Sequence, residues 1–254
     1  MDTQDQLHQI RLADGLVTLY RGDCNSAAVQ THHFDALISD PPYGMNYVST
    51  HRDGRDKTTA FGRYIKGESF APIHGDDKPF DPTPWVTLAG SRPCVLWGAN
   101  YFSDRLPANG HWMIWDKREG NRPNDQADCE MAWSNLKGPP RLFSHLWIGL
   151  CRRGEENLST GARKLHPNQK PVALMDWLLD QCKLKEGDTV LDPFMGSASL
   201  GVACVRRGIR YIGCEISHEY FEVARNRLEQ EIGKSGRGFV QPQAAWDSPQ
   251  VSLF

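Results

Sequence analysis

The stretch Asp188-Thr189-Val190-Leu191-Asp192-Pro193-Phe194-Met195-Gly196-Ser197 decides the fold, because a buried strand leads there into a glycine turn that opens a helix. The apolar run in this stretch predicts the strand, and residues Ser197–Arg207 predict the helix. A second strand over Arg210–Cys214 and a second helix over Glu219–Ile232 repeat the pattern. Strands that alternate with helices predict an α/β fold with a parallel sheet and helices on both faces.

The first part of the chain shows the same alternation. Residues Leu16–Tyr20 predict a strand, and a Gly22-Asp23 turn and a short helix separate it from a second strand at Phe34–Ile38. Short apolar runs between residues 84 and 150 predict further strands. An amphipathic helix is expected over residues 171–182, where the first residue is a proline, a favoured start of a helix.

At 254 residues the chain is long enough to bury one core, and we expect a single domain over residues 1–254. Residues 45–80 are polar and rich in Gly, Asp, Lys and Arg, which predicts a long loop of the kind that is usually functional. We expect residues 45–165 to form a loop and recognition insertion. Residues 233–254 lack periodicity and predict an irregular C-terminal tail.

The composition excludes several classes of protein. An apolar share of 39% and a charged share of 24% are ordinary for a soluble globular protein. No apolar run approaches the ~20 residues of a membrane helix, and the polar N-terminus does not resemble a signal peptide. We therefore expect a cytoplasmic protein with no membrane partner. The seven cysteines form no CxxC pair, which argues against a disulfide framework and a zinc site, so we expect no metal.

The charge is unevenly distributed along the chain. The net charge is −2, yet residues 137–170 contain seven Lys or Arg and two Glu, a local excess of five positive charges. Such a run is typical of a solvated loop surface, and it is equally typical of a face that contacts nucleic acid. Both interpretations stay open on charge alone.

The turn Asp40-Pro41-Pro42-Tyr43 follows an apolar strand directly. A carboxylate and a backbone carbonyl freed from secondary structure can accept the hydrogens of an amine, and a tyrosine ring can stack on a flat base. Taken alone, the same turn could be only a proline-stiffened bend. Its position at the end of a strand nevertheless predicts a site for a flat ring that carries an amine.

A second candidate site lies at residues 192–197, between a buried strand and a helix. Doubly wound sheets bind nucleotides at this place, and Gly196 allows close approach to the backbone. Glu215 ends the next strand and can accept hydrogen bonds from ribose hydroxyls. Because no GxxxxGK[ST] run is present, a nucleoside without phosphates fits better than ATP or NAD.

These motifs resemble those of the S-adenosylmethionine-dependent DNA amino-methyltransferases. The resemblance rests on Asp40-Pro41-Pro42-Tyr43, on His166-Pro167-Asn168-Gln169-Lys170-Pro171, on residues 192–197 and on Glu215. The acceptor turn precedes the cofactor turn, as in the permuted beta group of that family. The resemblance covers most of residues 15–230, and only loosely 45–165. It implies a Rossmann-like methyltransferase sheet of seven strands, and S-adenosylmethionine as cofactor.

The resemblance also implies roles for the matched residues. The catalytic turn is expected to comprise Asp40, Pro41, Pro42 and Tyr43, with the Asp40 carboxylate and the Pro41 carbonyl as acceptors and Tyr43 stacked on a base flipped from the duplex. Where the family usually has a second glycine, this chain has Ala198, and we expect a slightly adjusted turn. Cofactor contacts are expected from Asp23, Cys24, Asp40, His166, Asn168, Lys170, Asp192, Phe194, Gly196, Ser197 and Glu215.

The expected reaction is methylation of adenine at N6 in duplex DNA. The resemblance favours adenine because the cytosine-N4 enzymes usually carry serine at the position of Asp40. It also implies a homodimer. Arginines near the acceptor turn and in the basic stretch are expected to contact DNA phosphates, namely Arg52, Arg55, Arg152 and Arg153.

Several alternatives are weighed against this interpretation. Cytosine-N4 methylation needs the same acceptor chemistry, and methylation of RNA or of a protein glutamine amide is disfavoured by the motif order and by Asp at position 40. A catalytically silent DNA-binding module is disfavoured by the intact acceptor and cofactor residues. The pair Pro93-Cys94 is typical of cytosine-C5 enzymes, but here it opens an apolar run and predicts a buried thiol. His166 has no partner at metal spacing.

Overall fold

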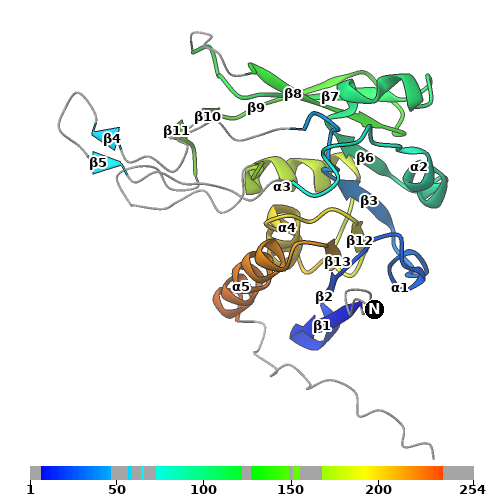
Figure 1. Ribbon diagram of the computed structural model, residues 1–254, viewed down its shortest axis with the longest axis vertical. Helices are drawn as coiled ribbons and strands as arrows, with labels where there is room; N and C mark the ends of the chain where they lie inside the picture. The colour runs from blue at the N-terminus through cyan, green and yellow to red at the C-terminus, as the bar shows by residue number, and fades with distance from the viewer. Residues whose placement is uncertain are drawn as a thin grey trace, which may run out of the picture.

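The protein is built around a nine-stranded mixed sheet in the order β1-β2-β13-β12-β3-β6-β8-β7-β9 (Figure 1). The computed structural model describes residues 7–46, 57–58, 64–65, 73–121, 127–148, 151–154 and 168–236. The strands of the sheet are β1 (His8–Leu12), β2 (Val17–Arg21), β3 (Ala36–Ser39), β6 (Cys94–Trp97), β7 (His111–Asp116), β8 (Cys129–Ser134), β9 (Arg141–Ser144), β12 (Thr189–Asp192) and β13 (Arg210–Glu215).

Five adjacent strands, β2-β13-β12-β3-β6, run parallel to one another. Their carboxyl ends therefore meet at one edge of the sheet. The chain leaves β12 toward β13 in one direction and leaves β3 toward β6 in the other, so β12 and β3 flank the point where the strand order reverses. Ligands of doubly wound sheets bind at such a switch point. The fold thus brings the two turns that follow β3 and β12 to the same place.

Right-handed crossovers in opposite directions place helices on opposite faces of the sheet. The helices α3 (Val172–Gln181), α4 (Ser199–Arg207) and α5 (His218–Lys234) cover one face, and α1 (Ala27–Gln30) and α2 (Thr83–Ala89) cover the other (Figure 1). Short 3-10 helices lie at η2 (Ala13–Gly15), η3 (Ala99–Tyr101) and η4 (Ser103–Arg105).

Each face of the sheet has its own apolar core. Side chains alternate along a strand, so Ala36 and Ile38 of β3 join the core under α3 to α5, whereas Leu37 joins the core under α1 and α2. The largest buried side chains in the first core include Trp97 and Trp115. Because both faces are covered, the central strands are apolar throughout, as parallel strands usually are.

The predicted α/β fold is confirmed, with differences at the edges. Seven strands are contiguous from β2 to β7, and β1 and β9 extend the sheet to nine. Strands β6 to β9 belong to this main sheet although they lie within the expected insertion 45–165, so the expected boundaries of that insertion were too wide. Strand β1 and helix α2 were not predicted, because five and seven residues carry little periodic signal.

Two small ladders lie outside the main sheet. Within the expected loop 45–80, β4 (Lys57–Thr58) pairs with β5 (Tyr64–Ile65). The second ladder joins β10 (Trp147–Ile148) to β11 (Cys151–Arg152). Within the described ranges, none of the helices combines the length and the apolar character that a membrane-spanning segment requires. The expected tail begins inside α5, and residues 237–254 lie outside the described part of the chain.

Candidate active site

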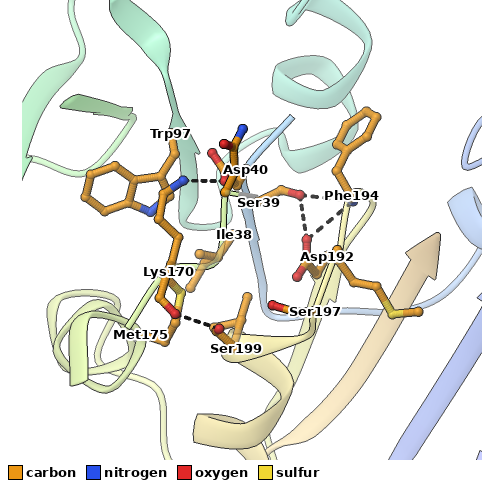
Figure 2. Close-up of a pocket in the computed structure, with 14 residues that line it drawn as sticks. Ile38, Ser39, Asp40, Trp97, Lys170, Met175, Asp192, Phe194, Ser197 and Ser199 are labelled. Atoms are coloured by element: carbon orange, nitrogen blue, oxygen red, sulfur yellow. Dashed lines mark hydrogen bonds and ion pairs between the residues drawn. The ribbon is translucent and has the colours of Figure 1, made fainter. Parts of the chain in front are cut away.

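A pocket opens at the switch point between the carboxyl ends of β3 and β12 (Figure 2). The turn after β3 contributes Asp40, and the turn after β12 contributes residues 192–197. The floor and walls come from the neighbouring strand β6 and from α3 and α4. The lining residues are Ile38, Ser39, Asp40, Trp97, Asn168, Lys170, Met175, Asp192, Phe194, Met195, Gly196, Ser197, Ser199 and Leu200.

Asp192 ties the two halves of the pocket together. Its carboxylate accepts hydrogen bonds from the Ser39 hydroxyl at 2.6 Å, from the Tyr211 hydroxyl at 2.8 Å and from the Phe194 amide at 3.3 Å. The residue is 4% exposed, and burial raises the pKa of its carboxyl to about 7 despite these donors. Figure 2 shows Asp192 beneath Ser39, beside Phe194. Its main structural effect is to join β3 to β12.

The raised pKa of Asp192 predicts a pH-dependent stability. Between its ordinary pKa of 3.8 and about 7, the folded state binds more protons than the unfolded state, so the free energy of unfolding falls as pH rises through this window. The shift corresponds to about 4 kcal/mol. We expect Asp192→Asn to lose this contribution, so the stability difference between variant and wild type changes steadily from pH 4 to 7 in urea unfolding. Parallel curves of stability against pH for variant and wild type would contradict this expectation. The matched control is Asp104→Asn, because the Asp104 side chain is 74% exposed.

The Glu215 carboxylate is hydrogen-bonded to backbone amides of the glycine turn and of the start of α5. Its carboxylate accepts hydrogen bonds from the Gly196 amide at 3.1 Å and from the Ser217 amide at 2.8 Å, while burial raises its pKa. Gly196 and Ala198 both have left-handed backbone angles, with φ of 49° and 53°. At Ala198, where an adjusted turn was expected, the backbone is left-handed although the residue is not glycine. This conformation costs an alanine about 1 kcal/mol. Both carboxylates, Asp192 and Glu215, face the glycine turn.

The turn after β3, residues 40–43, is held by contacts with Asp76 on one side and Lys170 on the other. The Asp76 carboxylate accepts hydrogen bonds from the Tyr43 and Gly44 amides, each at 2.9 Å. The Tyr43 hydroxyl donates to Asp40 Oδ1 at 2.6 Å, and Lys170 forms an ion pair with Asp40 Oδ2. Burial raises the pKa of Asp40, although the Lys170 ammonium partly offsets the effect. Asp76 was missed because it lies in the polar stretch with no motif.

The ring of Tyr43 lies against residues 98–101. A methyl group on Gly98 would come within 1.9 Å of the Tyr43 ring, so only glycine allows this approach. The Tyr101 ring stacks on Tyr43 at 5.2 Å between centroids and an interplanar angle of 17°. Tyr101 itself is 49% exposed. A flat aromatic surface next to Asp40 is therefore accessible from outside the pocket, and sequence reasoning did not identify its second ring.

Lys170 lies against Asp40 in this structure. The resemblance placed it over the methionine portion of the cofactor, and it does line the pocket, but its ammonium faces the Asp40 carboxylate (Figure 2). Burial opposes the charge of Lys170, yet the carboxylates of Asp40 and Glu130 outweigh burial and raise its pKa. Glu130 in turn pairs with Lys117 at 2.8 Å. Neither Glu130 nor Lys117 was singled out from sequence.

The remaining predicted cofactor residues are placed as follows. Asn168, Phe194 and Ser197 line the pocket, and Phe194 packs edge-on against Phe80 and Trp85. The Asp23–Cys24 turn follows β2 next to the end of β13, since the Gly22 amide donates to the Glu215 carbonyl at 3.0 Å. This turn does not line the pocket. His166 lies outside the described residues.

The predicted phosphate contacts have mixed outcomes. Arg52 and Arg55 lie outside the described residues. Arg152 is 7% exposed and lies over the Trp147 ring at 5.5 Å, so this arrangement does not support it as a phosphate contact. Arg153 is exposed and pairs with Glu119 at 2.5 Å. Its expected contact with DNA stays a prediction.

Two expectations concern cysteines and metals. Cys94 is fully buried, and burial raises the pKa of its thiol to about 12, which confirms the prediction of a core thiol. Over the described ranges, no cluster of three or more His, Cys, Asp or Glu side chains is arranged to hold a metal ion.

Fold and site together define a doubly wound α/β protein with a pocket at the switch point of the sheet, beside the turn that carries Asp40. Residues 105–226 match the N6_N4_Mtase family model, which describes a DNA methylase. The match spans 122 of the 254 residues, just under half of the chain. The match covers β7 to β13 and most of α5, but not the acceptor turn.

Curated relatives are similar over parts of the chain. The Type II methyltransferase M2.DpnII of Streptococcus pneumoniae is 47% identical over 146 residues, 58% of this chain and 50% of that protein. The Type II methyltransferase M.HpaI of Haemophilus parainfluenzae is 45% identical over 101 residues, 39% of this chain and 29% of that protein. The matched segments thus span half or less of these relatives.

Solved structures of similar shape include two methyltransferases. The M1.HpyAVI-SAM complex has a TM-score of 0.48 at 20% identity, over 84% of this chain and 98% of that one. The cytosine-N4-specific PvuII DNA methyltransferase has a TM-score of 0.49 at 13% identity, over 87% of this chain and 92% of that one. The description of the fold rests on the strand order itself.

Proposed function

We propose that the chain is a DNA adenine-N6 methyltransferase that uses S-adenosylmethionine and works in the cytoplasm, where its DNA substrate would be. The observation that carries this proposal is the Asp40 carboxylate in the wall of the pocket that Asp192 and Gly196 also line. An acceptor for an amine and a place for a nucleoside are thus adjacent, as a transfer between the two requires.

The chemistry of the pocket fits the proposed cofactor. Lys170 is the only Lys or Arg among the described residues that line it, and this ammonium is already paired with Asp40, so no lysine or arginine of that lining is free to hold a phosphate. The lining also contains two carboxyl groups, Asp40 and Asp192. Such a lining suits a nucleoside that carries a positive charge. When bound, S-adenosylmethionine supplies an electrophilic methyl group on a sulfonium.

The residues of the acceptor turn would act on the amine. The lone pair of the adenine amine is delocalised into the ring, so attack requires a pyramidal nitrogen. Acceptors for the amine hydrogens favour this geometry and stabilise the positive charge that develops on nitrogen, and Asp40 and the Pro41 carbonyl are placed to do so. The transfer would form the C–N bond as the C–S bond breaks, and Asp40, as an acceptor of the amine hydrogens, would take the proton that the nitrogen then loses. Tyr43 would stack on the flipped base.

Glu215 offers a test of cofactor binding. We expect Glu215→Ala to weaken S-adenosylmethionine binding by roughly ten- to a hundredfold, because hydrogen bonds to a charged group contribute about 1.5–3 kcal/mol. The variant also removes the acceptor of the Gly196 amide. Calorimetry measures the affinity, and Glu219→Ala in the exposed first turn of α5 is the control. An unchanged affinity would remove Glu215 from the site.

The reaction itself is tested with labelled S-adenosylmethionine and, separately, duplex DNA, single-stranded DNA and RNA. We expect label in duplex DNA and not in RNA of the same sequence. Label in RNA alone would overturn the proposal in favour of the RNA alternative, and label in cytosine would favour N4 methylation.

The proposed homodimer, which the resemblance implies, is tested separately by the mass of the protein in analytical ultracentrifugation.

A further inference from the structure

The ammonium of Lys170 lies among three oxygen acceptors in the wall of the pocket. It forms an ion pair with Asp40 Oδ2, lies 3.1 Å from Glu130 Oε2 and lies 3.2 Å from the Tyr43 hydroxyl. Its side chain is 6% exposed. A buried ammonium can donate three hydrogen bonds; Asp40 and the Tyr43 hydroxyl accept two of them, and Glu130 lies within ion-pair distance.

Lys170 thereby occupies the place where a target amine would bind. Both oxygens of Asp40 are engaged, Oδ1 by the Tyr43 hydroxyl and Oδ2 by the Lys170 ammonium. An amine that approaches Asp40 would share these oxygens with the present donors or replace one of them. Since the Tyr43 hydroxyl belongs to the same turn as Asp40, the ammonium of Lys170 is the group that can move aside.

Glu130 is placed to receive that ammonium. It lies on β8, where Glu130 is paired in register with Trp115 of β7, and Lys117 holds its Oε1 at 2.8 Å. Its other oxygen, Oε2, is buried and makes no hydrogen bond within the described part of the chain, although Lys170 Nζ lies only 3.1 Å away. Burial opposes its charge, yet Lys170 and Lys117 outweigh burial and hold its pKa at about 2.

We propose that Glu130 is a positioning residue that takes the Lys170 ammonium from Asp40 when the target amine binds. Asp40 and Glu130 flank one ammonium, so a small movement of Nζ weakens one ion pair and strengthens the other, and Asp40 keeps the Tyr43 hydroxyl and gains the amine hydrogens as donors. Buried acceptors that lack a hydrogen bond cost free energy, and the movement supplies Oε2 with its donor. This inference rests on the proposed function, because it concerns the amine that Asp40 accepts.

The proposal predicts a specific pattern of turnover. Glu130→Gln keeps the shape of the side chain but removes its charge, so Lys170 stays on Asp40. We expect kcat to fall by roughly ten- to a hundredfold, the range that misplacement of a reacting group produces. The affinity for S-adenosylmethionine stays within about twofold. Glu130→Asp, which keeps the charge, restores part of the loss, and Glu219→Gln is the surface control.

A double-variant cycle separates positioning from a general structural role. In a Lys170→Met background no ammonium remains to be moved, so Glu130→Gln should cause no further loss of kcat. The full loss in that background, or wild-type kcat in Glu130→Gln alone, would overturn the proposal. If Glu130→Gln fails to fold, Glu130→Asp is compared in the same two backgrounds. Absence of DNA methylation by the wild-type protein would instead refute the proposed function.

Discussion

Replacement of Asp40 by alanine is expected to lower the rate of methyl transfer by roughly a hundred- to a thousandfold, the effect of removing one preorganised group that stabilises charge in the transition state. Among the described residues, Asp40 is the only carboxylate that the Tyr43 hydroxyl and the Lys170 ammonium both contact. Its loss removes the acceptor for the amine. Single-turnover measurements with duplex DNA and labelled cofactor give the rate.

Cofactor affinity distinguishes a catalytic loss from a damaged pocket. Asp192 and Glu215 keep their own hydrogen bonds in Asp40→Ala, because none of those bonds involves Asp40. We therefore expect S-adenosylmethionine to bind the variant nearly as well as it binds the wild type. The control is Asp104→Ala, at an exposed position on η4. A variant that methylates at the wild-type rate would remove Asp40 from the mechanism.

Replacement of Gly98 by alanine is expected to lower turnover by roughly a hundredfold, because the added methyl group displaces the Tyr43 ring by an ångström or more. The clash involves three ring atoms of Tyr43 at 1.9 to 2.5 Å, and the ring carries the hydroxyl that donates to Asp40. Moving the ring disturbs both the stacking surface and the acceptor. Gly98 also has φ of 68°, so alanine is strained there.

A second glycine provides a control variant for the backbone strain that alanine causes at Gly98. Gly120 has φ of 80°, and a methyl group built on it meets nothing within 4 Å. Gly120→Ala should therefore lose about 1 kcal/mol of stability through the left-handed backbone alone and keep its turnover. Thermal unfolding and initial rates are measured for both variants. Equal turnover in the two would show that Tyr43 need not lie where the structure has it.

Local patterns predicted the parts of the site that follow strands. Asp40 and Asp192 both come directly after short apolar runs, and parallel strands deliver such residues to one edge of the sheet. The two strands between residues 188 and 215 and the helix between them have clear periodic runs. Their observed bounds, β12, α4 and β13, differ from the predicted ones by two residues at most.

The partners of Asp40 could not be predicted in the same way. Lys170 and Glu130 meet only because β8 lies between β6 and β7, and that order depends on the packing of the whole sheet. The same packing explains the error in the expected insertion, since β6 to β9 read as short separate runs. The surroundings of Arg152 could not be predicted for a related reason, because a charge in a basic stretch gives no sign that its side chain lies over a tryptophan ring.

The central claim is tested most directly by the chemical identity of the modified base. Duplex DNA is incubated with the protein and S-adenosylmethionine, digested to nucleosides and analysed by mass spectrometry, with Asp40→Ala in parallel. We predict N6-methyladenine with the wild-type protein and background levels with the variant. N4-methylcytosine with the wild-type protein, or equal N6-methyladenine with both proteins, would contradict the account.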